Sequence, residues 1–339
     1  MTAPVATGHE TLIRVENLSV TLSSGVRAVD GVSFEIRRGE CVALVGESGC
    51  GKTLTALSLL RSLPPGVDRI ECGRIELGGR RLDRMPPGEL RRVRGGEIAM
   101  VFQDPTTSFN PLFKIGAQIV ETIRAHRRTG RGAAEETALE ALEDAGLDGP
   151  SRIFDSYSHQ LSGGQRQRAF IAMALATGPK LLIADEPTTA LDVTVQRQIL
   201  DLLARLAAER GLSLLLITHN LAVVAHLADR VLMMYAGQIV ESAPAADLFS
   251  RPGHPYTRAL LDCLPRLDVV RDQPPTIPGS VPRPGNWPAG CRFRDRCVSA
   301  AAGCENSQEL EQLNQDKGDR LVRCWRAVEL NGPQAGADD

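Results

Sequence analysis

Short apolar runs along the chain alternate with segments in which apolar residues recur every three or four positions. The short runs are rich in β-branched residues and predict strands at 12–20, 32–36, 41–45, 98–102, 181–184, 214–217 and 231–235. The periodic segments predict helices at 55–60, 115–128, 133–145, 165–176, 193–209 and 221–228. Strands that alternate with helices are typical of an α/β core with a largely parallel sheet. The pattern therefore predicts such a core.

Two regions depart from this alternation. Residues 70–77, followed by the turn Gly78-Gly79, predict a β-hairpin. After a short strand at 238–241 and a short helical stretch, seven prolines between 265 and 288 predict a stiff, irregular segment. This segment separates the predicted core from a region that contains four of the cysteines.

Composition narrows the classes of function. The 339 residues are 42% hydrophobic, and the formal net charge is −2, so no basic field for nucleic acid is present and no nucleic-acid partner is expected. No apolar run reaches the roughly 20 residues that span a bilayer. Residues 1–10 lack the basic and apolar regions of a signal peptide, so we expect a cytoplasmic protein. Cysteines in that compartment favour metal sites over disulfides.

One segment fits the phosphate-binding loop G-x-x-x-x-G-K-[ST]. It consists of Gly46, Glu47, Ser48, Gly49, Cys50, Gly51, Lys52 and Thr53. The motif lies between a predicted buried strand and a predicted helix, as it does in nucleotide-binding proteins. Glycines let backbone N–H groups point at phosphate oxygens, and the helix N-terminus favours anions. We expect Lys52 to reach the β and γ phosphates of ATP and the Thr53 hydroxyl to bind Mg²⁺.

Cys50 raises a separate expectation. A helix N-terminus lowers the pKa of a nearby thiol, so alkylation of Cys50 is expected to block ATP binding unless nucleotide protects it. The alternative is a small residue that the loop merely tolerates.

Polar residues follow two of the predicted strands. Asp185 and Glu186 end the run 181–184, and Gln103 follows the run 98–102. Ligands of open α/β sheets bind at the carboxyl ends of the strands. We expect Asp185 to hold Mg²⁺ and Glu186 to accept a proton from the attacking water.

A further motif, Leu161-Ser162-Gly163-Gly164-Gln165, resembles the signature of the ATP-binding-cassette (ABC) ATPases. Together with Gln103, Asp192 and His219, it extends the resemblance from about Leu12 to Ser242. The resemblance implies an ABC-type nucleotide-binding domain with a RecA-like core, an antiparallel β subdomain and a helical subdomain at about 112–176. This domain is expected to span residues 1–250, and residues 251–339 are expected to form a small, irregular, cysteine-rich extension.

The resemblance also assigns roles. Gln103 is expected to be the Q-loop glutamine, which contributes to catalysis and to the Mg²⁺ site together with Thr53 and Asp185. Glu186 is the expected catalytic base, and His219 is the expected switch histidine at the γ-phosphate. The segment 190–192 looks like the D-loop. In this family the signature of one subunit covers the nucleotide of another, so the expected nucleotide contacts include Ser162, Gly163, Gly164, Gln165 and Asp192.

One position departs from the family pattern. Leu22 stands where the family usually places an aromatic ring that stacks on adenine. Base stacking is therefore expected to be weaker or to come from elsewhere.

Three further segments are similar to the ATPases of dipeptide and oligopeptide importers: 103–111, 254–257 and 278–282. They imply a subunit that hydrolyses ATP to power peptide import at the cytoplasmic face of the membrane. Its expected partners are a second ATPase, which we expect to be a different chain, two transmembrane permeases and an extracytoplasmic peptide-binding protein. An importer of nickel or another small solute is the alternative. A cassette ATPase that acts on DNA or ribosomes, or a metal-sensing regulator, fits the motifs less well.

The C-terminal cysteines Cys291, Cys297, Cys304 and Cys324 have the spacing C-x5-C-x6-C-x19-C. Four thiolates can bind a [4Fe–4S] cluster or zinc, although zinc sites favour closer pairs. Five arginines flank these cysteines and are expected to offset the charge of a thiolate-bound cluster: Arg292, Arg294, Arg296, Arg323 and Arg326. Some dipeptide-importer ATPases carry a cluster on a similar pattern. We therefore expect a [4Fe–4S] cluster, with zinc as the alternative.

Overall fold

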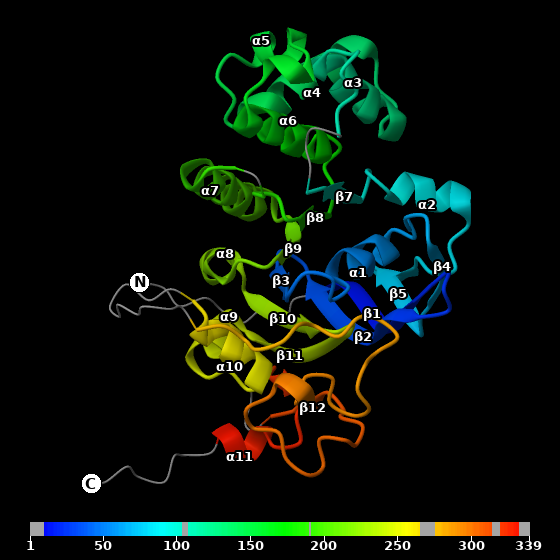
Figure 1. The fold of residues 1–339 in the computed structure, drawn as a ribbon. Helices are drawn as coiled ribbons and strands as arrows, with labels where there is room; N and C mark the ends of the chain where they lie inside the picture. Colours follow the sequence, from blue (N-terminus) through cyan, green and yellow to red (C-terminus); the bar gives the residue numbers. More distant parts are fainter. Residues whose placement is uncertain (1–9, 104–107, 190, 265–274, 314–318, 332–339) are drawn as a thin grey trace. The chain divides into compact units, whose positions relative to one another are not determined.

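The computed structural model describes residues 10–103, 108–189, 191–264, 275–313 and 319–331 (Figure 1). The chain divides into two compact units, each assembled from separate stretches of sequence. Unit 1 comprises Met1–Arg14, Glu35–Cys41 and Ile75–Ile217. Unit 2 comprises Val15–Phe34, Val42–Arg74 and Thr218–Asp339.

Unit 1 contains three parallel strands: β7 (Ile98–Val101), β8 (Leu181–Asp185) and β9 (Ser213–Thr218). β8 pairs with both neighbours, so Ile98, Leu181 and Ser213 lie side by side. Every residue of β8 and β9 is buried, as expected for strands covered on both faces. Helix α2 (Pro87–Val93) precedes β7, and α7 (Val193–Arg210) connects β8 to β9. The predicted parallel arrangement is confirmed here.

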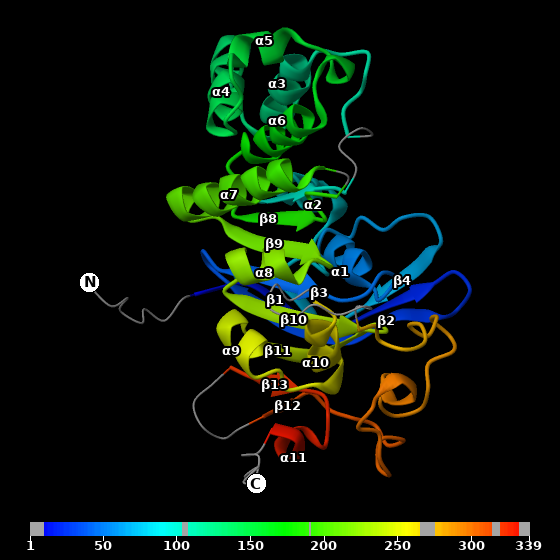
Figure 2. The same ribbon diagram turned by 60° about the vertical axis from the view of Figure 1, so that its left-hand side comes forward.

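A group of helices lies between β7 and β8 in the sequence. It consists of α3 (Ile115–His126), α4 (Arg131–Asp144), α5 (Pro150–Asp155), the 3₁₀ turn η1 (Ser158–Gln160) and α6 (Gly163–Leu175). Helices α3, α4 and α6 pack against one another, and α5 packs against α3 and α4 (Figure 2). On α3, the buried side chains Ile115, Ile119 and Ile123 recur every four residues and form its core-facing side.

In unit 2, β3 (Cys41–Val45) runs parallel to β10 (Arg230–Tyr235). β10 continues antiparallel to β11 (Gln238–Pro244), which pairs with β13 (Leu321–Val322), and β13 pairs with β12 (Glu311–Gln312). The helices of this unit are α1 (Lys52–Leu59), α8 (Leu221–Leu227), α9 (Ala245–Ser250), α10 (Pro255–Asp262) and α11 (Ala327–Asn331), with the 3₁₀ turn η2 (Arg294–Arg296).

Antiparallel strands form the remaining β structure. β1 (Thr11–Leu22) and β2 (Arg27–Arg37) contribute residues to both units, and β1 pairs with β4 (Val67–Glu71). Residues 67–77 form two strands, β4 and β5 (Arg74–Leu77), and the Gly73 N–H between them donates to the Glu16 carbonyl at 2.9 Å. The predicted hairpin turn is present, since Leu77 of β5 pairs with Arg80 of β6 (Arg80–Arg81) across Gly78-Gly79.

The chain beyond β11 is tied to the core of unit 2 by a buried carboxylate. Glu241, on β11, is fully buried and accepts the N–H groups of Gly253 and His254 at 2.7 and 2.8 Å. His254 accepts the Tyr256 N–H through Nδ1 at 3.0 Å, which caps α10. Burial raises the pKa of Glu241 and lowers the pKa of His254 to about 3. These contacts fix the first helix of the extension.

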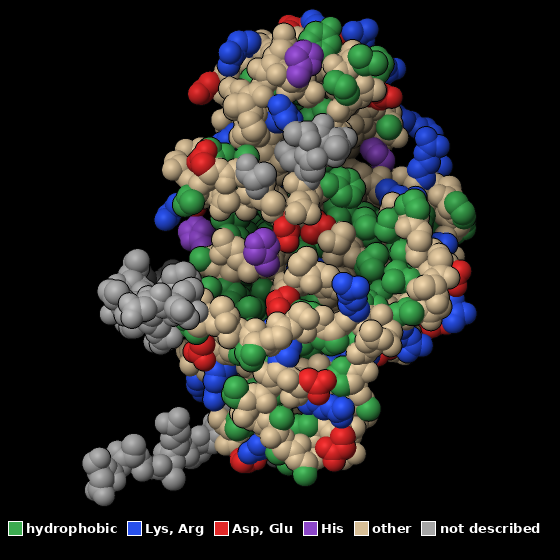
Figure 3. Space-filling view, viewed as in Figure 1, with side chains coloured by type: hydrophobic (Ala, Val, Ile, Leu, Met, Phe, Trp, Pro, Cys, Tyr) green, Lys and Arg blue, Asp and Glu red, His purple; other side chains and the backbone are tan. Residues whose placement is uncertain are grey.

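None of the helices in the described part of the chain is long and apolar enough to cross a bilayer. On the face drawn in Figure 3, acidic and basic side chains lie among one another.

Candidate functional site

The predicted phosphate loop lies between β3 and α1 in unit 2. α1 begins at Lys52, and no side chain caps its first turn. The orientation of the loop amides is therefore set by the backbone conformation of the loop. Gly51 has a φ of 105°, a conformation that favours glycine. A Cβ on Gly46 would lie 2.1 Å from the Met234 carbonyl oxygen, so only glycine fits at this position. The glycines therefore set the path of the loop.

Lys52 holds the loop closed from inside. Its side chain is buried, and Nζ donates to the carbonyl oxygens of Gly46 at 2.8 Å and Glu47 at 3.1 Å. The amide of Gly237, in the β10–β11 turn, donates to the Cys50 carbonyl at 2.9 Å. Thr53 is exposed on the first turn of α1. An ammonium group at the centre of a ring of loop backbone suits the binding of a polyphosphate.

In unit 1, the carboxyl end of β8 contains the two predicted acids. Asp185 is buried at the end of the strand. Glu186 follows with a φ of 47°, which is uncommon for a side chain of this size. Its carboxylate accepts hydrogen bonds from Gln103 Nε2 at 3.1 Å and Thr189 Oγ1 at 2.9 Å. The structure thus brings Gln103 and Glu186 together, and it adds Thr189, which the sequence reasoning missed.

The predicted signature residues begin α6. Ser162 is the N-cap: its Oγ accepts the Gln165 N–H at 3.2 Å, and Gln165 Oε1 accepts the Ser162 N–H at 3.1 Å. This reciprocal pair is a capping box. A Cβ on Gly164 would lie 2.8 Å from Val195 Cγ1, which accounts for this glycine. Ser162 and Gly163 are exposed, so the N-terminus of α6 is open to an anion.

Two more predicted residues lie at the start of α7 and just after β9. Asp192 caps α7, since its Oδ1 accepts the Val195 N–H at 2.9 Å. His219 follows β9 in unit 2, and its side chain is exposed. The structure therefore places Gln103, the two acids and the signature in unit 1, and the phosphate loop and His219 in unit 2.

Comparisons with known proteins extend this picture. Residues 29–189 match the family model described as ABC transporter, and residues 240–304 match the one described as oligopeptide/dipeptide transporter, C-terminal region. A probable peptide ABC transporter ATP-binding protein of Sinorhizobium fredii is 46% identical over 308 residues, 91% of each chain. The oligopeptide transport ATP-binding protein AppD of Bacillus subtilis is 45% identical over 96% of this chain and 99% of its own length. The chain belongs to the ATP-binding subunits of the oligopeptide/dipeptide ABC transporters.

Solved structures agree with the family. A dimeric ATP-binding cassette bound to ADP and Pi is similar with a TM-score of 0.61 and 28% identity, over 69% of this chain and 99% of the other. The ABC subunit cbiO1 of Clostridium perfringens gives a TM-score of 0.62 and 27% identity, over 71% of this chain and 91% of its own. The predicted cassette fold is confirmed, and this ABC subunit is an ATP-binding ATPase.

The expected lowering of the Cys50 pKa is wrong. Its side chain is only 1% exposed, and burial raises the pKa of its thiol, although the Lys52 ammonium 3.9 Å away acts in the opposite direction. Burial therefore outweighs the expected effect of the helix N-terminus on the pKa of this thiol, and the effect of alkylation on ATP binding stays a prediction.

The four C-terminal cysteines lie in one neighbourhood of this ABC subunit. The Cys291 N–H donates to the Cys304 carbonyl at 2.8 Å, and burial raises the pKa of Cys291 to about 11. Burial also raises the pKa values of Cys297 and Cys324. Among the described residues, no three His, Cys, Asp or Glu side chains are arranged to hold a metal ion. The predicted cluster therefore stays a prediction.

The arginines beside these cysteines have other partners than expected. Arg292 pairs with Asp30 and stacks on the Trp287 ring at 3.5 Å. Arg296 pairs with Glu47 of the phosphate loop at 2.9 Å. Arg292 and Arg296 thus each pair with a carboxylate, and their expected role beside a cluster stays a prediction. The contact of Arg296 with Glu47 was not predicted from the sequence, since the two residues lie 249 positions apart.

Proposed function

We propose that this chain hydrolyses Mg-ATP to power the import of dipeptides and oligopeptides. The observation that carries the proposal is a set of hydrolytic residues joined to a C-terminal region that matches the oligopeptide/dipeptide transporter model over residues 240–304. The names of its relatives, which include peptide import ATP-binding proteins of Brucella, support the substrate class.

The phosphate loop would bind the nucleotide. The buried Lys52 ammonium would exchange its bonds to loop carbonyls for bonds to the β and γ phosphates of ATP. Amides at the start of α1 would bind phosphate oxygens. Oxygen donors from Thr53, Gln103 and Asp185 suit Mg²⁺, which prefers hard oxygen ligands. The ion would neutralise charge on the phosphates when it is bound.

Glu186 would act as the base. Its carboxylate would orient the attacking water and receive its proton, and the hydrogen bonds from Gln103 and Thr189 would fix the direction of the carboxylate. A left-handed backbone at a side chain of this size costs about 1–3 kcal/mol, and such strain persists mostly at functional sites. His219 would contact the γ-phosphate, and this contact would be lost when the γ-phosphate is released.

A second ATPase subunit would complete the site. The exposed N-terminus of α6, with Ser162 and Gly163, would bind the γ-phosphate of the nucleotide held by that partner, and Gly164, Gln165 and Asp192 would shape this surface. ATP would then join the two subunits, and hydrolysis would release them.

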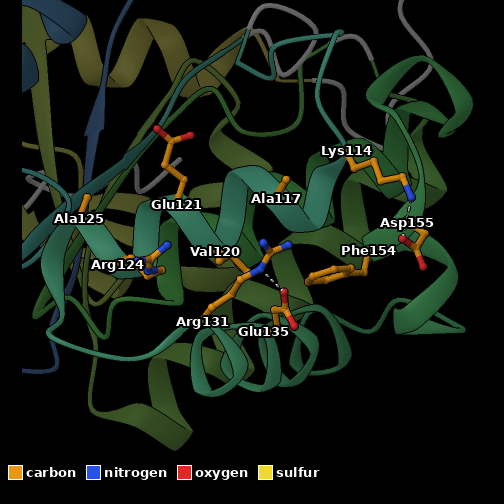
Figure 4. A pocket seen from close by; sticks show the side chains of 10 residues that line it. All are labelled: Lys114, Ala117, Val120, Glu121, Arg124, Ala125, Arg131, Glu135, Phe154 and Asp155. Carbon is orange, nitrogen blue, oxygen red and sulfur yellow. Dashed lines mark hydrogen bonds and ion pairs between the residues drawn. The ribbon is translucent and has the colours of Figure 1, made fainter.

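The helices of unit 1 offer a surface for a membrane subunit. A hollow of about 630 Å³ opens among α3, α4 and α5 (Figure 4). Arg131 and Glu135 of α4 pair there at 2.8 Å, and Lys114 pairs with Asp155 at 2.9 Å. Leu112 is 79% exposed and Phe113 is 56% exposed just before α3. We propose that a permease segment docks at this apolar and charged surface. Residues 104–107 of the importer-like segment 103–111, where such a permease segment could also dock, lie outside the described residues.

Purification of the chain from its native membranes tests the proposal. Mass spectrometry of the material that co-purifies should find two permeases, a second cassette ATPase and a binding protein with bound peptide. A binding protein that carries nickel or another small solute would favour the alternative substrate. Ribosomal or DNA-repair proteins without permeases would contradict a role in transport and would also contradict the expected place at the cytoplasmic face of the membrane.

The cofactor at the C-terminal cysteines is a separate proposal. We propose a [4Fe–4S] cluster, with zinc as the alternative, on Cys291, Cys297, Cys304 and Cys324. Support comes from their common neighbourhood, although the thiols would have to turn toward one another to bind it. Analysis of iron, sulfide and zinc in anaerobically purified protein tests this, with the Cys304→Ser variant as the control. Protein that contains none of these elements would refute the proposal.

A further inference from the structure

The C-terminal extension reaches the phosphate loop at Glu47. The Glu47 carboxylate accepts hydrogen bonds from two nitrogens of the Arg296 guanidinium, at 2.9 and 3.2 Å. The Glu47 backbone N–H donates to the Tyr256 hydroxyl oxygen at 3.0 Å. Both Arg296 and Tyr256 come from the region that follows the predicted cassette domain, and all three residues belong to unit 2. The loop is thus held at both its backbone and its side chain.

Arg296 is fixed in place by more than Glu47. Its side chain is 7% exposed, its Nε donates to the Pro278 carbonyl at 2.8 Å, and its guanidinium reaches the Tyr235 hydroxyl at 3.3 Å. Its own N–H donates to the Phe293 carbonyl in the 3₁₀ turn η2. The guanidinium fork therefore has little freedom to move away from the loop.

A cluster of aromatic rings supports Tyr256 and Arg296. Tyr256 is fully buried, and its ring lies 4.7 Å from Tyr235 and 5.4 Å from Phe293, measured between centroids. Phe293 also meets Tyr235 edge-on at 5.3 Å. These rings connect β10, α10 and η2, so Tyr256 and Arg296 are presented to Glu47 by a rigid core.

The charge of Glu47 gives these contacts a function. A phosphate loop must attract a polyphosphate that carries several negative charges, and an uncompensated carboxylate in the loop would repel it. Arg296 cancels this charge without occupying the loop. Because Glu47 is partly exposed, with 29% of its side chain accessible, its charge would otherwise act on the bound nucleotide.

We propose that Arg296 is a positioning residue for ATP binding: it neutralises Glu47 and, together with Tyr256, holds the phosphate loop ready for the nucleotide. This proposal rests on the proposed role of residues 46–53. It assigns the C-terminal extension a direct part in the affinity of the cassette for ATP.

The test measures binding of Mg-ATP to the full chain by calorimetry, together with KM, kcat and the melting temperature. Arg296→Gln is expected to raise Kd and KM by about ten-fold or more, because bonds to charged groups are strong enough for that factor. kcat at saturating ATP should change little. Arg294→Gln is the matched control, because Arg294 lies in the same turn and pairs with Asp295 rather than with the loop.

A second substitution separates charge from packing. If Arg296 acts by cancelling the charge of Glu47, Glu47→Gln in the Arg296→Gln background should recover most of the lost affinity. An equally weak double variant would overturn the proposal, because a structural defect would not be repaired by removal of the carboxylate. An unchanged Kd in folded Arg296→Gln would overturn it as well.

Two more variants keep the test decisive. Arg296→Lys retains the charge but not the fork and should lie between wild type and Arg296→Gln; a loss as large as that of Arg296→Gln would contradict the proposed charge role. Tyr256→Phe removes the acceptor for the Glu47 N–H and should weaken ATP binding several-fold, and no change would contradict the part assigned to Tyr256. Wild-type protein that fails to bind Mg-ATP would instead refute the proposed function of the loop.

Discussion

Replacement of Glu186 by glutamine removes the proposed catalytic base and leaves the rest of the site unchanged. Glutamine has the same shape, and its amide oxygen can accept the same hydrogen bonds from Gln103 Nε2 and Thr189 Oγ1 that the carboxylate accepts at 3.1 and 2.9 Å. The φ of 47° is equally uncommon for glutamine, so the backbone strain stays the same. Fold and ATP binding should therefore persist while proton acceptance is lost.

The expected loss follows from what a general base contributes. Removal of such a group lowers a rate by about 10²–10⁴-fold. This corresponds to about 3–5 kcal/mol of transition-state stabilisation. Thr189→Val serves as the partial variant, because it removes one of two donors that orient the carboxylate but leaves the base itself. We expect its kcat to fall by much less than that of Glu186→Gln.

The assay is release of phosphate at saturating Mg-ATP, with the Kd for Mg-ATP and the melting temperature measured on the same protein. Glu186→Gln should show a kcat at least about 100-fold below wild type, with a similar Kd and melting temperature. A variant that retains more than about a tenth of the wild-type kcat would refute the assignment of Glu186 as the base.

Three further predictions follow from the packing. Gly46→Ala should destabilise the fold by about 1–3 kcal/mol and weaken ATP binding, because the new Cβ would lie 2.1 Å from a backbone oxygen that cannot move aside. Denaturant unfolding measures the loss of stability. Gly132→Ala is the control, because a Cβ on Gly132 would meet no atom within 4 Å. A Gly46→Ala variant that is as stable as wild type would contradict the predicted clash. Cys50 should react with iodoacetamide far more slowly in the native protein than in urea, since burial raises the pKa of its thiol, and equal rates by peptide mapping would disprove this. The pKa of His254 is lowered to about 3, so the folded state keeps it neutral while the unfolded chain takes up a proton below about 6.5. Its contribution to stability is complete above pH 6.5 and falls toward pH 3 by up to about 1.4 kcal/mol per unit. The free energy of unfolding of wild type should thus fall relative to that of His254→Asn between pH 7 and pH 5.5. A difference that stays constant over this range would contradict the lowered pKa of His254.

Local patterns predicted most of the secondary structure. β3 agrees with the predicted strand 41–45 at both ends, because a fully apolar run next to a glycine-rich loop has one simple interpretation. α5 was not predicted, since six residues that begin with Pro150 show too little periodicity. The hairpin predicted at 70–79 is present, but the division of its first part into β4 and β5 is not visible in the local sequence.

The candidate site shows the same limit. The motif residues were found from their types and spacing, and the structure places Gln103 beside Glu186 as the motifs imply. Contacts between distant parts of the chain were not predictable. Arg296 looked like a neighbour of Cys297, and only the fold shows that it faces Glu47. Burial, which raises rather than lowers the pKa of Cys50, likewise depends on tertiary packing.

The central claim is that ATP hydrolysis by this chain powers peptide import. The most direct test is uptake of a labelled peptide into proteoliposomes that contain the complete complex purified from native membranes, with Mg-ATP on the side of the ATPase subunits. The account predicts uptake that requires ATP and is lost in complexes with Glu186→Gln. Peptide uptake that persists in that variant, or a complex that takes up nickel and no peptide, would contradict it.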